Sequence, residues 1–502
     1  MKRFPNADLI IVLSLCLITF LASFMNLRNG HEWGGDFSQY IAQGRAVCQG
    51  TVPEFRRDNL FIIENSSEGL GMPVYSWGFP LLLSLFMKLG ADSIFLMKFS
   101  GVLSLCVCVA AVYLMSAKKA GRPAAVTVSL LAALSPELLG ASDQIMSDLP
   151  YSAFALLSLL FMEKLGYMKP EEKRGNKSAG RTMVLTAALT GFFSLYATEI
   201  RSNGYALILT FICGLLLAQL KDRIIFTKNI LWKPGMISSF TVFAVYGAGL
   251  ILFRLILPGS PESSSMFGRN FLSVMLVNTE RNLFVMRKLF ALNDVYASYI
   301  FFFCFLCLAL AGFIACFEKN FLAAIYCAGS FFLYMIWPYD QGMRFLYSIA
   351  LLMLPAAASG FGLIARKTFS GRVTAALSFF LIFLALMNAV HGGIRNIRAK
   401  RTMEHGAYSA DAEDIFGYIS ENTGKDSVIM FKKPRVLYFR TGRPGFTPPA
   451  DRLKDRISDA DYILTCTELD PYDEDVLRES GVKLSRVYEN DRFLLRKVER
   501  GN

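Results

Sequence analysis

The sequence predicts a polytopic α-helical membrane protein of about eleven transmembrane helices, followed by a small soluble α/β domain. Three observations lead to this fold class. The 502 residues are 54% hydrophobic and only 18% charged, and the apolar residues gather in runs long enough to cross a bilayer. The strongly basic short loops between these runs fall on one side of a single topology. From Tyr408 on, charges become dense and the apolar segments shorten.

The first apolar run, residues 7–25, is interpreted as an uncleaved span. It follows Lys2 and Arg3, which hold its start in the cytoplasm, and no small-residue cleavage site follows Phe24. The outer loop 26–93 comes next. Within it the stretch 78–90 is too short to cross a bilayer of about 30 Å, so we expect a half-buried or surface helix there.

Ten further spans complete the predicted membrane domain, residues 1–392. They cover 94–116, 124–139, 151–165, 183–196, 205–220, 236–257, 300–317, 321–336, 345–364 and 374–390. A long outer loop, 258–299, separates two of them, and its residues 271–290 have the apolar spacing of an amphipathic surface helix. The net charge of +12 is explained by the basic cytoplasmic loops, so it does not indicate a nucleic-acid partner.

Residues 393–502 are predicted to form an extracytoplasmic α/β domain. A capped helix is expected at 409–424 and another helix at 471–481. Strands are expected at 427–433 and 460–467, with two more in 482–498 that turn at 489–492. Residues 434–442 fit a short helix or a strand. The domain has no Gly-rich phosphate loop, so we do not interpret it as a nucleotide site.

Asp36 is the candidate catalytic residue. It lies just past the first span, behind Gly34 and Gly35 and among aromatic residues that include Tyr40. A carboxylate at a membrane boundary is costly to desolvate, so a functional need or access to water must keep it there. Other polar residues return to the same predicted surface from separate segments: Glu32, Asp143, Asp148, Glu199, Arg201, Asp340 and Arg344.

These residue types suit sugar transfer from a lipid phosphate. Asp36 would take a proton from the acceptor, and Arg201 and Arg344 would bind the phosphate, because a guanidinium grips two oxygens at once. Alternatively, each arginine is an interfacial residue paired with Glu199 or Asp340.

Two further features of the predicted outer surface each have two possible roles. Asp143 and Asp148 could bind a divalent cation or supply a second carboxylate, but Asp148 before Pro150 also fits a helix N-cap. Arg269 helps to make the long outer loop basic, which would attract an anionic lipid carrier or ordinary phospholipid head groups.

The cysteine and histidine patterns do not identify a metal site. Eight of the ten cysteines lie in or beside apolar runs, where Cys behaves as a small hydrophobic residue. Cys48 and Cys466 are both expected to face outward, and a disulfide between them is left open. Three histidines are too few and too scattered for a His-based site. Metal dependence is therefore left open.

Four stretches of the sequence resemble the C-type (GT-C) integral membrane glycosyltransferases. They are GGDFSQY (34–40), WGFPLLLSLF (77–86), LSPELLGASDQIMSDLPYSAFALLSLL (134–160) and WPYDQGMRFLYSIALLMLP (337–355). The chain is most similar to the protein O-mannosyltransferases and the lipid A aminoarabinose transferases. Many relatives have two adjacent acids, whereas Asp36 lies between Gly35 and Phe37, so a role for a second acid is in doubt. The WWDYG-type signature of oligosaccharyltransferases is absent.

The resemblance implies an enzyme that uses a polyprenyl-phosphate sugar on the outer face of the cytoplasmic membrane, with Asp36 as the catalytic residue. The acceptor would be a glycan, a lipid or a protein. The main alternative is a secondary transporter or lipid flippase, which would need charges within spans and often repeated halves. Few spans carry a central charge; Arg254 is the main candidate and lies near an end. A third alternative is a non-catalytic scaffold of the cell envelope.

Overall fold

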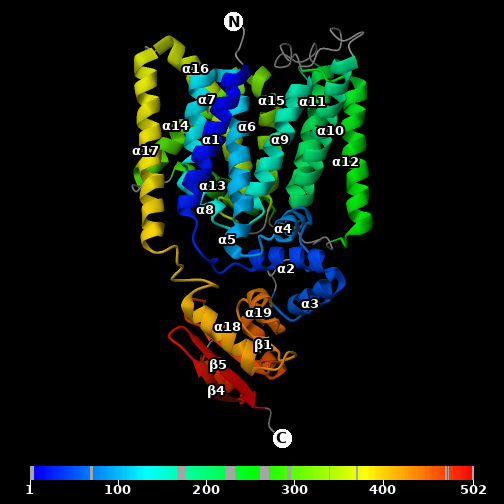
Figure 1. Ribbon diagram of the computed structural model, residues 1–502, viewed down its shortest axis with the longest axis vertical. Coiled ribbons are helices and arrows are strands. Elements are labelled where there is room, and N and C mark those ends of the chain that lie inside the picture. Colours follow the sequence, from blue (N-terminus) through cyan, green and yellow to red (C-terminus); the bar gives the residue numbers. More distant parts are fainter. Residues whose placement is uncertain are drawn as a thin grey trace.

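The computed structural model describes residues 5–67, 72–166, 177–220, 232–259, 271–290, 295–337, 340–368, 371–469, 472 and 474–499. These residues form a long helical bundle with a small α/β domain beyond one end (Figure 1). The chain starts at the opposite end of the bundle, and the short helices α2 and α3 lie between the bundle and the α/β domain. The architecture agrees with the predicted fold class.

Nine helical segments among the described residues are long and apolar enough to cross a membrane, which makes the chain a multi-pass membrane protein. They are α1 (Pro5–Asn26), α5 with α6 (Ile94–Met97 and Phe99–Ala120), α9 (Asp148–Gly166), α10 (Lys177–Ile200), α11 (Tyr205–Gln219, with the preceding turn), α12 (Met236–Ile256), α14 (Val295–Ala315), α16 (Tyr347–Thr368, with the preceding turn) and α17 (Gly371–Arg398).

The remaining two predicted spans differ from regular spans. Helices α7 (Arg122–Ala133) and α8 (Pro136–Ser142) meet at 55°, and counting them as one broken span gives ten. The break is at Ser135, whose hydroxyl caps α8, and Pro136 begins the new helix. Helix α15 (Phe317–Met335) forms as expected but is not among the candidates, because Glu318, Lys319 and Asn320 make its first turn polar.

Helices α6, α9 and α16 form the interior of the bundle, while α1, α12 and α17 expose most of their apolar side chains. Small residues allow the closest helix contacts. A Cβ on Gly312 of α14 would lie 1.8 Å from the carbonyl oxygen of Ala356 on α16. Close backbone approach of this kind is typical of membrane helices, which gain little from the hydrophobic effect inside lipid.

The outer loop contains more helix than the sequence predicted. Helix α2 (Gly35–Gln49) begins directly before Asp36 and ends at Gly50, whose φ of +74° suits glycine. Helix α3 (Val52–Glu64) follows, with proline in its first turn. The predicted short apolar helix is present as α4 (Gly78–Lys88) and is not among the candidate spans. The helix predicted in the second long loop is also present, as α13 (Phe271–Val285).

The α/β domain has a five-stranded sheet of order β2-β1-β3-β5-β4. Strand β1 (Ile429–Met430) is parallel to β2 (Gly445–Phe446) and β3 (Tyr462–Cys466), whereas β5 (Phe493–Glu499) is antiparallel to β3 and β4 (Lys483–Glu489). Helices α18 (Ala410–Asn422), α19 (Pro434–Thr441), α20 (Leu453–Arg456) and α21 (Glu474–Glu479) complete it. The predicted helices and strands are present, and the open choice for 434–442 is resolved as helix α19.

An aromatic anchor joins this domain to the segment before α2. The ring of Trp33 lies 6.0–6.4 Å from those of Phe416, Phe431 and Phe493, which come from α18, the end of β1 and β5. Its indole nitrogen donates a hydrogen bond to Glu468, at 2.7 Å. Because Trp33 is three residues before Asp36, this packing sets the position of α2 relative to the domain.

Candidate active site

Asp36 lies in the first turn of α2, where the helix dipole favours a negative charge. The Tyr75 hydroxyl donates a hydrogen bond to Oδ1 at 2.8 Å. The Arg344 guanidinium donates to Oδ2 at 3.1 Å. The Asp36 side chain is 33% exposed. The carboxylate is thus oriented by two donors and still open to a ligand.

Arg344 connects Asp36 to a second acid. It begins a short 3-10 turn, Arg344–Leu346, just before α16, and its Nε lies 3.2 Å from Asp148 Oδ2. Asp148 is the first residue of α9, and its side chain is only 3% exposed. Arg201, between α10 and α11, forms an ion pair with the other oxygen, Oδ1. Four distant segments therefore meet in one network, Asp36–Arg344–Asp148–Arg201.

Arg201 has further contacts that fix its position. Its guanidinium carbon lies 4.1 Å from the centre of the Phe345 ring. Its Nη1 lies 3.4 Å from the hydroxyl of Ser147, which is 3.0 Å from the Tyr40 hydroxyl. Burial, with a smaller contribution from Asp36, raises the pKa of Tyr40 to about 12. Tyr40 is therefore a neutral hydroxyl beside the network.

The charges of the network balance, with two carboxylates and two guanidiniums. Their exposure differs: Asp36 and Arg344 are partly open to solvent, whereas Asp148 is buried. A buried carboxylate between two arginines holds both cations in place. The arrangement places a base and a cation side by side at an accessible surface, which suits proton transfer next to a group that gains negative charge.

The α/β domain also reaches this site. Arg435, the second residue of α19, is buried and donates from Nη1 to the Tyr75 hydroxyl at 2.9 Å and from Nη2 to the Met72 carbonyl at 3.0 Å. Burial raises the pKa of Tyr75, so the phenol keeps its proton. The Tyr75 hydroxyl therefore accepts from Arg435 and donates to Asp36.

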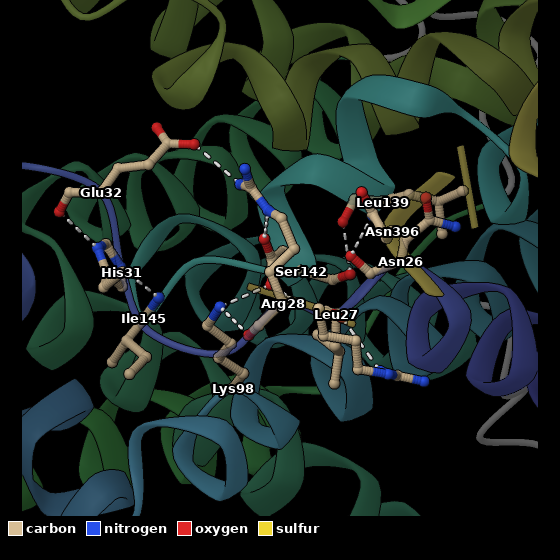
Figure 2. Close-up of polar contacts among 12 residues, drawn as sticks. Asn26, Leu27, Arg28, His31, Glu32, Lys98, Leu139, Ser142, Ile145 and Asn396 are labelled. Atoms are coloured by element: carbon tan, nitrogen blue, oxygen red, sulfur yellow. Dashed lines mark hydrogen bonds and ion pairs between the residues drawn. The ribbon is translucent and has the colours of Figure 1, made fainter. Parts of the chain in front are cut away.

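Arg28 is at the centre of a second charged cluster, in which Figure 2 shows it near Glu32 and Lys98. Arg28 forms ion pairs with Glu32 at 2.8 Å and with Asp143 at 2.7 Å. Lys98, which is fully buried, contacts the other Asp143 oxygen at 2.6 Å. Glu32 and Asp143 are thus held by this cluster. Asp143 and Asp148 bind different cations and do not form one shared acidic site.

His31 fixes the segment between the two clusters. Its Nε2 accepts a hydrogen bond from the backbone N–H of Ile145 at 3.1 Å, and its Nδ1 lies 3.1 Å from the Glu32 carbonyl (Figure 2). The ring stacks on Phe37 at 4.0 Å. Burial lowers the pKa of His31 to about 3, so the ring is neutral with its proton on Nδ1.

Two predicted site residues that the structure describes, Glu199 and Asp340, join neither the Asp36 network nor the second charged cluster. Glu199 is buried in α10, where its Oε1 has no hydrogen-bond partner among the described residues. Asp340 is 59% exposed and lies 3.5 Å from Arg281. Arg269 lies outside the described residues. The alternative pairing of the two site arginines with Glu199 or Asp340 is wrong, because their partners are Asp148 and, for Arg344, also Asp36.

Several residues of the site were missed by reasoning from the sequence: Arg28, Tyr75, Lys98, Ser147 and Arg435. Lys98 carried a signal, because it is the sole charged residue within 94–116. The other four residues carried no such sequence signal, because their roles arise from tertiary packing. The described residues contain no group of three or more His, Cys, Asp or Glu that could hold a metal ion. The thiols of Cys48 and Cys466 are free.

Comparison with known proteins gives a match in structure. No family model matches the sequence, and no curated protein matches it. ArnT from Cupriavidus metallidurans, solved with undecaprenyl phosphate, superimposes with a TM-score of 0.57 at 12% identity over 98% of both chains. The archaeal oligosaccharyltransferase AglB from Archaeoglobus fulgidus, solved with an inhibitory peptide and a dolichol-phosphate, gives 0.57 at 11% identity, covering 92% of this chain and 69% of that chain. The chain therefore has the fold of the GT-C integral membrane glycosyltransferases.

Proposed function

We propose that the protein is a membrane glycosyltransferase that moves a sugar from a polyprenyl-phosphate donor to an acceptor, with Asp36 as the catalytic base. The Asp36–Arg344–Asp148–Arg201 network is the observation that supports this most strongly. The proposal also draws on the structural neighbours, two of which were solved with a polyprenyl phosphate. We place the reaction on the outer face of the cytoplasmic membrane, where the predicted topology puts Asp36 and the α/β domain.

The proposed reaction is a displacement at the anomeric carbon of the donor sugar. The acceptor hydroxyl or amine attacks that carbon and gives its proton to Asp36, while the bond from the sugar to the phosphate oxygen breaks and polyprenyl phosphate leaves. Asp36 suits the base, because it is accessible and fixed by Tyr75 and Arg344. Negative charge develops on the leaving phosphate, where a guanidinium is most effective.

The two arginines have different proposed roles. Arg344 is 33% exposed and one of its nitrogens is close to Asp36, so it would contact the phosphate directly. Arg201 is more buried and forms an ion pair with Asp148, so it would favour the phosphate charge from the buried side of the site, without direct contact. The donor phosphate would compete with Asp36 and Asp148 for Arg344, which would free Asp36 to meet the acceptor.

Tyr40, Glu32 and Asp143 are further proposed substrate contacts. Tyr40 is next to the network and would present a neutral hydroxyl. Glu32 and Asp143 are engaged by Arg28 and Lys98, so a ligand would have to replace an ion pair to reach them.

Purified protein in lipid nanodiscs tests the proposal. It would be given radiolabelled polyprenyl-phosphate sugars with a cell-envelope extract as acceptor, and the labelled product and released polyprenyl phosphate would be measured. Asp36→Asn should lower turnover by roughly 10²–10⁴-fold and keep donor binding. Arg344→Ala should weaken donor binding. Asp340→Asn, an exposed acid outside the network, is the matched control and should change neither.

Two outcomes would refute the proposal. If Asp36→Asn and Arg201→Ala both transfer sugar at the wild-type rate, the site is wrong. If the protein moves a labelled polyprenyl lipid across liposomes with no acceptor present and makes no glycosylated product, the flippase alternative is correct. A mass-spectrometric comparison of envelope glycans from cells with and without the protein would then identify the sugar and the acceptor.

A further inference from the structure

A cavity of about 630 Å³ lies between the end of α1, helix α8 and helix α17, apart from the Asp36 network. Helix α17 provides one wall with Leu384, Met387, Asn388, His391, Gly392 and Arg395. Counted from Leu384, these positions follow the spacing i, i+3, i+4, i+7, i+8 and i+11, so they form a single face of the helix. Arg28 and Asp143 of the second charged cluster also line the cavity.

The α17 face changes character along its length. Leu384 and Met387, toward the middle of the candidate span, are exposed and apolar. His391 and Arg395 lie one and two turns farther on, nearer the end that approaches the α/β domain (Figure 1). An apolar region followed by an imidazole and the cationic guanidinium of Arg395 matches the order of acyl chains and head group in a phospholipid.

The cationic end of this face has no protein partner within the described residues. The side chains of His391 and Arg395 form no hydrogen bond or ion pair there, in contrast to Arg28, which pairs with Glu32 and Asp143. The stretch 395–401, RNIRAKR, adds further cations and contains no acid. In the predicted orientation these charges are on the outer side, where span-flanking cations are usually few.

The packing of α17 on α1 gives the cavity a fixed wall. The Asn396 amide donates to the Asn26 carbonyl at 2.9 Å, and Asn26 contacts the Ala389 carbonyl at 3.4 Å. A Cβ on Gly392 would lie 2.9 Å from the Asn26 side chain, so glycine permits this approach. Figure 2 shows Asn26 and Asn396 joined beside Leu139, which also lines the cavity.

We propose that this cavity binds the phosphodiester head group of an anionic glycerophospholipid from the surrounding membrane. Arg395 and His391 contact the phosphate, and the acyl chains leave along Leu384 and Met387. The volume is within the range of small-molecule pockets, roughly 300–1,000 Å³, so it holds a head group while the chains remain in the bilayer. Arg201 and Arg344 do not line the cavity, so the site is separate from the proposed donor site.

Native mass spectrometry of the full-length protein tests this proposal. Delipidated protein is titrated with phosphatidylglycerol, with zwitterionic phosphatidylcholine of the same chains, and with inorganic phosphate. The wild type should bind phosphatidylglycerol roughly tenfold more tightly than phosphatidylcholine and should not retain inorganic phosphate. The double variant His391→Gln/Arg395→Gln should lose this preference. Arg398→Gln, on the same helix but outside the cavity lining, is the matched control and should keep it.

Two further variants separate binding from folding. Arg395→Lys keeps the charge and should retain part of the phosphatidylglycerol preference. Thermal unfolding in lipid-free detergent should be the same for the wild type and the double variant. The reason is that the side chains of His391 and Arg395 are exposed and form no ion pair with the described residues. Equal binding of the two lipids by the wild type would overturn the proposal. So would a double variant that behaves like Arg398→Gln, or retention of inorganic phosphate in place of lipid.

Discussion

The substitution Asp148→Asn removes the one buried charge that holds both arginines of the candidate site. Asn has nearly the same shape, so the change isolates the charge. Arg344 would keep Asp36 as a partner at 3.1 Å and is partly hydrated, so the free energy that Arg344 loses in this variant is small. Arg201 would lose its ion-pair partner in a largely buried position. Removing one partner of a buried pair costs about 3–5 kcal/mol, and we expect the low end, about 3 kcal/mol.

Two measurements check this expectation. Equilibrium unfolding in mixed detergent micelles gives the free energy of unfolding, and binding of a polyprenyl-phosphate sugar gives the donor Kd, which should rise because Arg201 and Arg344 lose their common anchor. Asp340→Asn is the control: its acid is exposed, its distance to Arg281 is 3.5 Å, and exposed pairs contribute about 0–1 kcal/mol. If Asp148→Asn and Asp340→Asn unfold alike and bind donor alike, the assigned role of Asp148 is refuted.

Three further predictions follow from single contacts. Tyr75→Phe removes the hydrogen bond to Asp36 and keeps the ring, so initial rates should fall about ten- to thirtyfold; an unchanged rate would contradict the role of the phenol. The free energy of unfolding should also fall, by about 1–3 kcal/mol, because buried Arg435 loses the same hydroxyl as an acceptor. The pKa of His31 is lowered from 6.5 to about 3, so the unfolded chain binds its proton first, and stability is complete above pH 6.5 and falls by up to about 1.4 kcal/mol per pH unit below it. His31→Gln should flatten this dependence in unfolding measured between pH 7 and pH 5, and equal slopes would exclude His31 as its source. Gly312→Ala should lower the unfolding temperature because helices α14 and α16 must separate, whereas Gly329→Ala, with nothing within 4 Å, should leave it unchanged.

Much of the membrane domain could be predicted from the sequence, because apolar length and the side of the basic loops are local signals. The bend between α7 and α8 was not predicted, although Ser135 and Pro136 are a helix-start signal inside the apolar run. Helices α2 and α3 were missed because they are short, mixed in polarity and stabilised by packing against the rest of the chain rather than by their own pattern.

The four charged residues of the candidate site could be predicted from the sequence, but the ion pairs that they form could not. Asp36, Asp148, Arg201 and Arg344 were identified because polar residues at span ends are conspicuous in an apolar sequence. Which acid pairs with which arginine depends on the relative rotation of four helices, and no local pattern encodes that. Arg435 is the extreme case, because its contact with Tyr75 spans 360 positions of the chain.

The contact between Arg435 and Tyr75 has a consequence for biogenesis. The groups around Asp36 come from positions 75, 148, 201, 344 and 435, so a nascent chain still attached to the ribosome lacks the last of them until nearly all of it has been synthesised. The carboxylate can therefore reach its final geometry only after the α/β domain has folded against α2. A chain that stalls within its later spans would insert into the membrane without the contact from Arg435, so it would lack the complete candidate site.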